Sequence, residues 1–302
     1  MKQRVITAFV LLAVLAVIVW QINTPIFIIA IAFFSAVAAN EIMKCAKISN
    51  KFLVGAGTAF AALVPFLVTE QPFAPWLICE KFADFHGTVP NIVFVILITL
   101  VFFLAMLKGY SHTSFENVAV AFFACVVVPY DFSLFVRLRN MELDTSSQFG
   151  IYIMFYALIC ALATDTGAQL GGMAFGKHKM APNISPKKTK EGAVCGIVFG
   201  VILNVIAIIL YNKFANTPLD RSQMIVFIAC SPVVGFMGMM GDLSASVLKR
   251  NFGVKDFGKI FPGHGGVMDR LDSTLFTLPL AYIIATVMEH YYALSATGSY
   301  ML

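Results

Sequence analysis

Closely spaced cysteines are missing from this sequence. Its six cysteines stand at least 34 residues apart along the chain, and no two of them form a CxxC pair. A disulfide framework or a zinc site built on such pairs is therefore excluded. We interpret the cysteines as small apolar packing residues.

Charge is also scarce. Lys, Arg, Asp and Glu make up 12% of the 302 residues, hydrophobic residues make up 59%, and the mean hydropathy is +0.85. This composition argues against an ordinary soluble enzyme and indicates an integral membrane protein. The net charge of +5 needs no nucleic-acid partner, because the loops of membrane proteins carry an excess of Lys and Arg on one side.

Apolar runs that could cross a bilayer recur along the chain, since a spanning helix needs about 17 to 25 residues. We predict nine such runs, at 4–20, 25–43, 52–69, 90–107, 115–136, 149–172, 192–212, 223–241 and 271–288. The predicted fold is all-α and polytopic, with about nine transmembrane helices. We divide it into residues 1–140, with helices one to five, and residues 141–302, with helices six to nine and their loops. No small-residue cleavage site follows the first run, so we expect it to be retained.

The loops between these runs differ in their content of Lys and Arg. With the N-terminus in the cytoplasm, 16 of the 21 cationic residues fall on the cytoplasmic side and 5 on the other side. Cytoplasmic loops carry such an excess in membrane proteins. The predicted topology is therefore N-in and C-out.

The stretch 242–272 concentrates charge in this apolar chain. Its 31 positions hold nine of the 37 charged residues, and charge beside hydrocarbon segments usually serves a function. If 242–250 is helical, Asp242, Ser246 and Lys249 lie on one face, at i, i+4 and i+7. Asp269 and Asp272, at i and i+3, share a face in the same way.

A glycine-rich turn at 262–266 lies between these two groups. Its backbone could approach a phosphate closely and offer N–H groups to it. Mg²⁺ prefers one or two carboxylates together with phosphate oxygens, and Lys or Arg neutralises charge on a transferring phosphoryl group. The stretch therefore has the groups that a metal-bound triphosphate needs. The glycines at 235, 238 and 241 predict a loosened end of the eighth span just before Asp242.

The sixth apolar run is unusual because it contains a carboxylate, Asp165. An ionisable residue inside a span marks a functional site by default. Small residues at 167, 168, 171 and 172 would let a helix or a ligand come close. A loop rich in lysine follows this run, at positions 177, 179, 187, 188 and 190.

One long pattern ties the charged stretch together. It is Ser246-x-Leu248-Lys249-Arg250-x4-Lys255-Asp256-x-Gly258-x2-Phe261-Pro262-x-His264-Gly265-Gly266-Val267-x-Asp269-Arg270-Leu271-Asp272. This pattern resembles the signature of the phosphatidate cytidylyltransferase (CDP-diacylglycerol synthase) family, with no mismatch in the defining positions. The lysine-rich loop, which ends in Glu191-Gly192, resembles the family's second motif. The chain departs from many relatives at Lys190, where they carry Trp, and at Ala245, where they carry Glu.

The resemblance is strong over about 160–280 and limited to hydropathy in the N-terminal half. It implies transfer of the cytidylyl group of CTP to phosphatidic acid, giving CDP-diacylglycerol and pyrophosphate for phospholipid biosynthesis. It implies Mg²⁺ as cofactor, with a monovalent cation as a candidate second ion. The expected partners are CTP, phosphatidic acid and the lipid bilayer, with no nucleic acid and with a homodimer as the candidate assembly. The active site is expected to face the cytoplasm at the cell membrane.

We predict three overlapping groups of site residues. The catalytic residues are Asp165, Lys249, Arg250 and Asp269. The residues that bind CTP or the lipid substrate are Lys187, Lys188, Ser246, His264, Gly265, Gly266 and Arg270. The metal ligands are Asp242, Asp269 and Asp272, with Asp165 as a candidate fourth.

Simpler interpretations stay open for several residues. Lys177 and Lys179 are typical of topology charges, and His264 could be a plain turn residue. Glu41 matches an acidic residue of the family, but we interpret it as an interfacial charge near Lys44. Two other functions also stay open. A CTP-dependent lipid kinase of the dolichol-kinase type would transfer the γ-phosphate instead, and a transporter would use the polar residues of the spans as an ion pathway.

Overall fold

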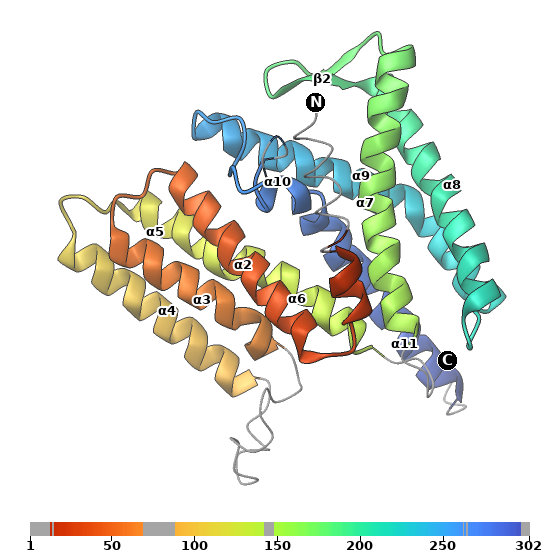
Figure 1. Cartoon of the computed structure of the whole chain (residues 1–302), viewed down its shortest axis with the longest axis horizontal. Coiled ribbons are helices and arrows are strands. Elements are labelled where there is room, and N and C mark those ends of the chain that lie inside the picture. Colours follow the sequence, from red (N-terminus) through yellow and green to blue (C-terminus); the bar gives the residue numbers. More distant parts are fainter. Residues whose placement is uncertain are drawn as a thin grey trace. The chain divides into compact units, whose positions relative to one another are not determined.

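The computed structural model describes residues 13, 15–68, 88–141, 148–261, 263 and 265–296. It consists almost entirely of helices (Figure 1). Six helical segments of the described chain are long and apolar enough to cross a membrane: Pro25–Cys45, Lys51–Val68, Phe115–Arg139, Phe149–Phe175, Lys190–Phe214 and Arg221–Asn251. The predicted all-α, polytopic membrane fold is confirmed. The first predicted run, 4–20, lies for the most part outside the described residues.

The chain divides into two compact units, one of residues 1–137 and 251–270 and the other of residues 138–250 and 271–302. The first unit contains α2 (Pro25–Cys45), α3 (Lys51–Val68), α4 (Thr88–Lys108), α5 (Phe115–Phe122), a π-helical turn (Phe123–Val127) and most of α6 (Val128–Arg139). It also holds most of the short helix α10 (Met268–Leu271). Helix α2 packs against α3, and the π-helical turn lies against both.

Polar side chains cap the N-termini of three helices in this unit. Thr24 accepts a hydrogen bond from the Ile26 N–H at 3.3 Å, and Pro25 occupies the first helical position of α2. Asn50 accepts from the second and third residues of α3, and Ser114 accepts from the Asn117 N–H in α5. Such side chains satisfy N–H groups that have no partner within the helix.

The second unit contains α7 (Gln148–Phe175), β1 (Lys179–Ala181), β2 (Ser185–Thr189), α8 (Lys190–Phe214), α9 (Arg221–Asn251) and α11 (Thr274–Ala296). Helices α7 and α8 lie side by side along much of their length (Figure 1), and α11 also packs on α7. A buried aromatic cluster of Tyr152, Tyr156 and Phe227 joins α7 to α9, and the Tyr156 hydroxyl donates to the Phe227 carbonyl at 3.0 Å.

Glycines let α7 and α8 approach closely. A Cβ atom at Gly167 would lie 2.6 Å from the Cβ of Phe199, and one at Gly171 would lie 2.2 Å from the Cβ of Cys195. Small residues at such positions allow two helix backbones to pack tightly in a membrane. The small residues of the sixth span are therefore helix-packing positions, one of the two uses that the sequence predicts for them.

The lysine-rich loop after α7 folds into a small antiparallel hairpin, β1–β2, which the sequence did not predict. Residue Lys179 pairs with Thr189, and Ala181 pairs with Ser185. The base of the hairpin is fastened by Glu191, whose carboxylate accepts the backbone N–H groups of Lys177 and His178 at 3.1 Å each. Thr189 then caps α8 by accepting from the Gly192 N–H. The hairpin is thus held in a defined place at the start of α8.

Helix α9 differs from the sequence expectation at its end. The glycines before Asp242 were expected to loosen a helix end there, but α9 continues without interruption to Asn251. These glycines are packing positions: a Cβ at Gly235 would lie 2.6 Å from the Thr164 hydroxyl, and one at Gly241 would lie 2.7 Å from the Asp272 carbonyl. The charged stretch 242–250 is therefore a direct helical continuation of the apolar segment before it.

Candidate active site

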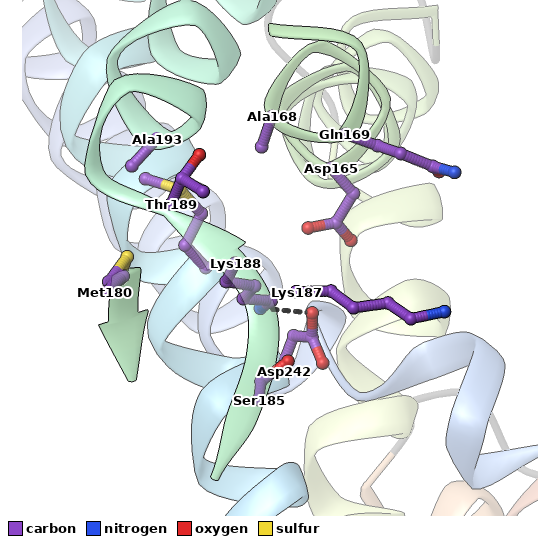
Figure 2. A pocket seen from close by; sticks show the side chains of 11 residues that line it. Asp165, Ala168, Gln169, Met180, Ser185, Lys187, Lys188, Thr189, Ala193 and Asp242 are labelled. Carbon is purple, nitrogen blue, oxygen red and sulfur yellow. Dashed lines mark ion pairs between the residues drawn. The ribbon is translucent and has the colours of Figure 1, made fainter. Parts of the chain in front are cut away.

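A cavity of about 320 Å³ opens within the second unit, between α7, the β-hairpin, α8 and α9 (Figure 2). Its lining residues are Asp165, Ala168, Gln169, Met180, Ser185, Lys187, Lys188, Thr189, Ala193, Met239 and Asp242. Four of these are predicted site residues: the carboxylates Asp165 and Asp242 and the lysines Lys187 and Lys188. The structure thus brings together residues from three separate segments of the sequence.

The hairpin lysines differ in their surroundings. Lys188 forms an ion pair with Asp242 (Figure 2), and each of these side chains keeps 25% of its surface exposed. Lys187, the neighbouring residue on β2, is exposed. One lysine therefore neutralises a carboxylate of the cavity, and the other presents its charge to solvent at the cavity.

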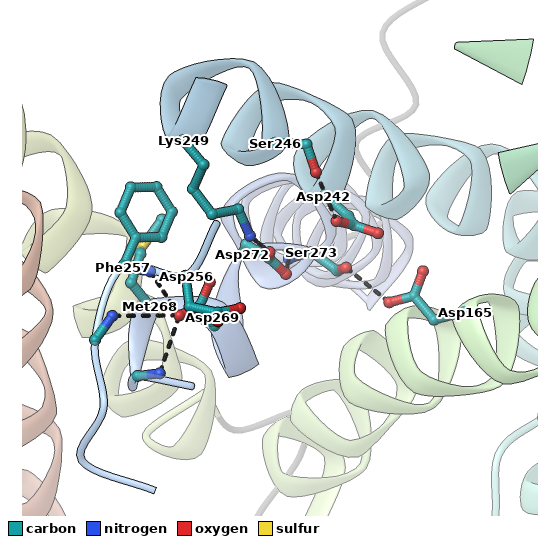
Figure 3. A network of polar contacts seen from close by, with 12 residues as sticks. Asp165, Asp242, Ser246, Lys249, Asp256, Phe257, Met268, Asp269, Asp272 and Ser273 are labelled. Atoms are coloured by element: carbon teal, nitrogen blue, oxygen red, sulfur yellow. Dashed lines mark hydrogen bonds and ion pairs between the residues drawn. The ribbon is translucent and has the colours of Figure 1, made fainter. Parts of the chain in front are cut away.

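Asp165 projects from α7 into the same cavity. One of its oxygens, Oδ2, accepts a hydrogen bond from the Ser273 hydroxyl at 2.9 Å (Figure 3). Ser273 is 5% exposed, and its backbone N–H donates to the Asp272 carboxylate at 2.9 Å. The start of α11 therefore orients both carboxylates. No feature of the sequence indicates the role of Ser273, because its partner Asp165 lies 108 positions earlier.

The predicted polar face of 242–250 is present on α9. The Ser246 hydroxyl lies 3.5 Å from Asp242 Oδ1, and Lys249 Nζ lies 3.6 Å from Asp272 Oδ2. Lys249 and Asp272 are nearly buried, with 11% and 10% of their side chains exposed. Removing one partner of such a pair would leave the other charge with little solvent around it, which is costly.

Arg250, the last charged residue of this helix, points to the hairpin. Its Nε donates to the Ile184 carbonyl, in the hairpin turn, at 3.2 Å. Arg250 is exposed, and a planar guanidinium suits a phosphate. The arginine links the position of the lysine-bearing hairpin to the end of α9.

The first unit holds the remaining predicted residues, in α10 and in the loop that leads to it. Oδ2 of Asp269 accepts backbone N–H groups from Phe257 at 2.8 Å, Gly258 at 3.4 Å and Gly266 at 2.9 Å (Figure 3). Gly265 has a φ of +85°, a conformation that favours glycine. Asp269 thus acts as an internal acceptor for the loop. The amide of Gly266, predicted to approach a phosphate, donates to Asp269 instead. Arg270 is exposed, and His264 lies outside the described residues.

Glu41 is placed differently from its interpretation as an interfacial charge. It is 6% exposed, and its two oxygens accept the backbone N–H groups of Val267 and Met268 at 3.2 and 3.0 Å. The sequence could not reveal this contact, because the partners lie 226 and 227 positions further along the chain.

The predicted metal ligands are distributed over both units. Asp242 and Asp272 belong to the second unit and Asp269 to the first. In the part of the chain that the structure describes, no group of three or more His, Cys, Asp or Glu side chains is arranged to hold a metal ion. The three-carboxylate metal site therefore stays a prediction.

Comparison with known proteins identifies the family. The model of the cytidylyltransferase family matches residues 2–288. The chain belongs to this family. Among its cytidylyltransferase relatives, the phosphatidate cytidylyltransferase of Bacillus subtilis (strain 168) is 31% identical over 96% of this chain and 99% of that protein. The proteins of the same name from Staphylococcus haemolyticus and Haemophilus influenzae are 30% and 29% identical, over 95% and 92% of this chain and 100% and 96% of their own lengths.

Proposed function

We propose that this chain is a membrane-bound phosphatidate cytidylyltransferase, which transfers the cytidylyl group of CTP to phosphatidic acid. The observation that carries this proposal is the cavity that combines Asp165 and Asp242 with Lys187 and Lys188 in a member of the cytidylyltransferase family. Relatives of nearly full-length similarity carry this name. CDP-diacylglycerol and pyrophosphate are the expected products.

The reaction needs few groups from the protein. An oxygen of the phosphatidate phosphate attacks the α-phosphorus of CTP, and the bond from that phosphorus to the bridging oxygen of the β-phosphate breaks. The electron pair leaves with pyrophosphate, and no covalent enzyme intermediate forms. The attacking phosphomonoester carries about −1.5 to −2 charges near neutral pH, so it needs no general base. The protein has to align two anions and reduce their repulsion.

The lysines of the hairpin fit this electrostatic task. Lys187 is exposed beside the cavity, and Lys188 pairs with Asp242. We assign Lys187 and Lys188 to the phosphate of phosphatidic acid. From the sequence pattern alone, we assign to the nucleotide the residues Ser246, Lys249, Arg250, His264, Gly265, Gly266 and Arg270.

The carboxylates of the cavity fit a magnesium ion in their chemistry. Asp165 and Asp242 present hard oxygen donors from two different helices to one cavity, and Mg²⁺ is usually bound by one or two carboxylates together with substrate phosphates. When bound, Mg²⁺ would polarise phosphoryl oxygens as a Lewis acid. Asp269 and Asp272 are the further ligands that we propose from the sequence. A monovalent cation is the candidate second ion.

Phosphatidic acid must reach the cavity from the bilayer. We propose that the cavity lies at the cytoplasmic leaflet of the cell membrane, because the 16 to 5 distribution of Lys and Arg supports a cytoplasmic position for the hairpin and the end of α9. An opening toward the lipid at this depth would let the headgroup meet CTP while the acyl chains stay in the membrane. A homodimer stays the candidate assembly.

Doubly labelled CTP tests the proposed function. The purified protein, in vesicles that contain phosphatidic acid, receives CTP labelled with tritium in the cytidine and with ³²P at the γ-phosphate. We expect tritium in the lipid product and ³²P in pyrophosphate. A lipid that carries only ³²P would show a CTP-dependent lipid kinase, and a lipid that carries neither label would contradict both enzyme functions and favour a transporter.

A further inference from the structure

We propose that Glu41 is a positioning residue that sets the conformation of the loop 256–268, and with it the nucleotide side of the active site. Glu41 and the loop both belong to the first unit. The assignment of the loop to the nucleotide rests on the proposed function, whereas the contact between Glu41 and the loop does not.

The first evidence is the way in which Glu41 binds the backbone. Oε1 accepts the Val267 N–H at 3.2 Å, and Oε2 accepts the Met268 N–H at 3.0 Å. These are the two residues directly before Asp269. A carboxylate can accept both hydrogen bonds at once because both of its oxygens are acceptors. Glu41 therefore fixes the backbone that leads into a predicted catalytic residue.

The second evidence comes from two glycines of the loop. A Cβ atom at Gly258 would lie 2.0 Å from Glu41 Oε1, and one at Gly266 would lie 2.3 Å from both carboxylate oxygens. A methyl group at either position would require the Glu41 carboxylate to move away from the two N–H groups that it binds. Gly258 and Gly266 belong to the pattern 246–272, and the structure gives a steric reason for glycine at both positions. The backbone of the loop therefore packs directly against the Glu41 carboxylate at both glycines.

The third evidence is a second contact from the same face of α2. Cys45 follows Glu41 by one helical turn, and its thiol donates to the Phe257 carbonyl at 3.0 Å. Glu41 thus holds the end of the loop, while Cys45 holds its beginning. Helix α2 thus contacts the loop at two points. Asp269 stabilises the same loop by accepting three of its N–H groups.

The role requires an ionised carboxylate of this length. Gln at position 41 keeps the shape but has one acceptor oxygen, and its amide N–H₂ would face a backbone N–H donor. Asp at position 41 is one methylene shorter, so its carboxylate oxygens would lie too far from the loop N–H groups. A buried N–H that loses its acceptor is costly, so the loop should leave this conformation in either variant.

The first experiment measures CTP and phosphatidate kinetics for Glu41→Gln. We expect the KM for CTP to rise about tenfold, the effect of losing one hydrogen bond to a charged group, while the KM for phosphatidic acid changes little. Glu116→Gln, at an exposed residue of α5, is the matched control and should behave like the parent. A lower maximal rate with both KM values unchanged would indicate a merely structural role and overturn the proposal.

The second experiment needs no activity and separates this inference from the proposed function. Amide hydrogen exchange of the loop peptide should be faster by about tenfold or more in Glu41→Gln, since one of the two protected N–H groups loses its acceptor. Gly258→Ala should lower the Tm of the parent, yet have no further effect in the Glu41→Ala background, where the steric conflict is gone. Gly55→Ala, at a glycine with no atom within 4 Å of an added Cβ, is the control. Unchanged exchange, or additive effects of Glu41→Ala and Gly258→Ala, would overturn the proposal even if cytidylyl transfer is confirmed.

Discussion

Lys188 of the β-hairpin forms an ion pair with Asp242 of helix α9, at the wall of the cavity that Asp165 also lines. The two partners lie 54 positions apart in the sequence, in segments that were predicted separately to bind phosphate and metal. The pair compensates the charge of a carboxylate that would otherwise face a second carboxylate without a cation. A bound phosphate or cation would compete for these same two side chains.

Neutralising the hairpin lysines should weaken the binding of the lipid substrate. We expect the Lys187→Gln/Lys188→Gln variant to raise the KM for phosphatidic acid about three- to tenfold, as expected for lost charge-assisted hydrogen bonds. The KM for CTP should rise less. The effect should be larger at low salt, because ions screen an exposed charge such as Lys187. Initial rates at two ionic strengths measure both values.

The matched control for these lysines is Lys177→Gln/Lys179→Gln, which removes two exposed charges from the same loop. This control should leave both KM values near those of the parent. If the KM for CTP rises more than that for phosphatidic acid in the first variant, the lysines hold the nucleotide. Unchanged values for both substrates would reduce them to topology signals.

The replacement Arg250→Lys should not be mild. Lysine has no N–H at the Nε position that donates to the Ile184 carbonyl, and it lacks the planar fork that suits a phosphate. We expect the KM for CTP to rise about tenfold through the loss of both features. Arg221→Lys, an exposed residue at the other end of α9, serves as control. Full rate with an unchanged KM for CTP in Arg250→Lys would remove Arg250 from the site.

Ser273 should matter through Asp165. In Ser273→Ala the half-buried Asp165 Oδ2 loses its hydrogen-bond donor at 2.9 Å, and the carboxylate loses a contact that fixes its orientation. We expect kcat to fall about tenfold, the effect of one hydrogen bond to a charged group, with a small change in Tm. Ser244→Ala, at an exposed residue of α9, provides the comparison. A parental kcat in Ser273→Ala would show that the orientation of Asp165 is not limiting.

The contact between α7 and α8 predicts a stability effect. A Cβ at Gly171 would overlap Cys195, with 2.2 Å between the two Cβ atoms. Gly171→Ala should therefore destabilise the protein by about 1–3 kcal/mol, as overpacking does in tight cores. Thermal unfolding in detergent measures this, with Gly55→Ala as control. Equal Tm values for the two variants would mean that the helices separate without cost.

The sequence predicted the helical layout well because the physics of the bilayer is simple. A span must satisfy its backbone groups internally and cover them with apolar side chains, so each helix appears as a long apolar run. The runs from 25–43 to 271–288 correspond to helices α2 to α9 and α11. The hairpin was missed because its strands of three and five residues are rich in Lys and contain Pro186. Such short strands show no alternation of apolar and polar residues.

The site was predictable in its residue types but not in its contacts. Lys188 and Asp242 were each predicted as site residues, but the sequence did not predict that they form an ion pair. The contacts of Ser273 with Asp165 and of Glu41 with the loop join residues more than 100 positions apart. Only the packing of helices decides such partners. The sequence alone therefore predicts the charged residues of a site, whereas the contacts that support these residues come from the structure.

The most direct test of the account is the rate of CDP-diacylglycerol formation by Asp242→Asn in vesicles, at saturating CTP, phosphatidic acid and Mg²⁺. Asn keeps the shape of the side chain and removes the negative charge that pairs with Lys188 and that we propose as a metal ligand. Turnover should fall by about 10²-fold or more, the scale of losing a key electrostatic contact in an active site, while Glu116→Gln keeps the parental rate. A near-parental rate in Asp242→Asn would contradict the assignment of this cavity as the active site.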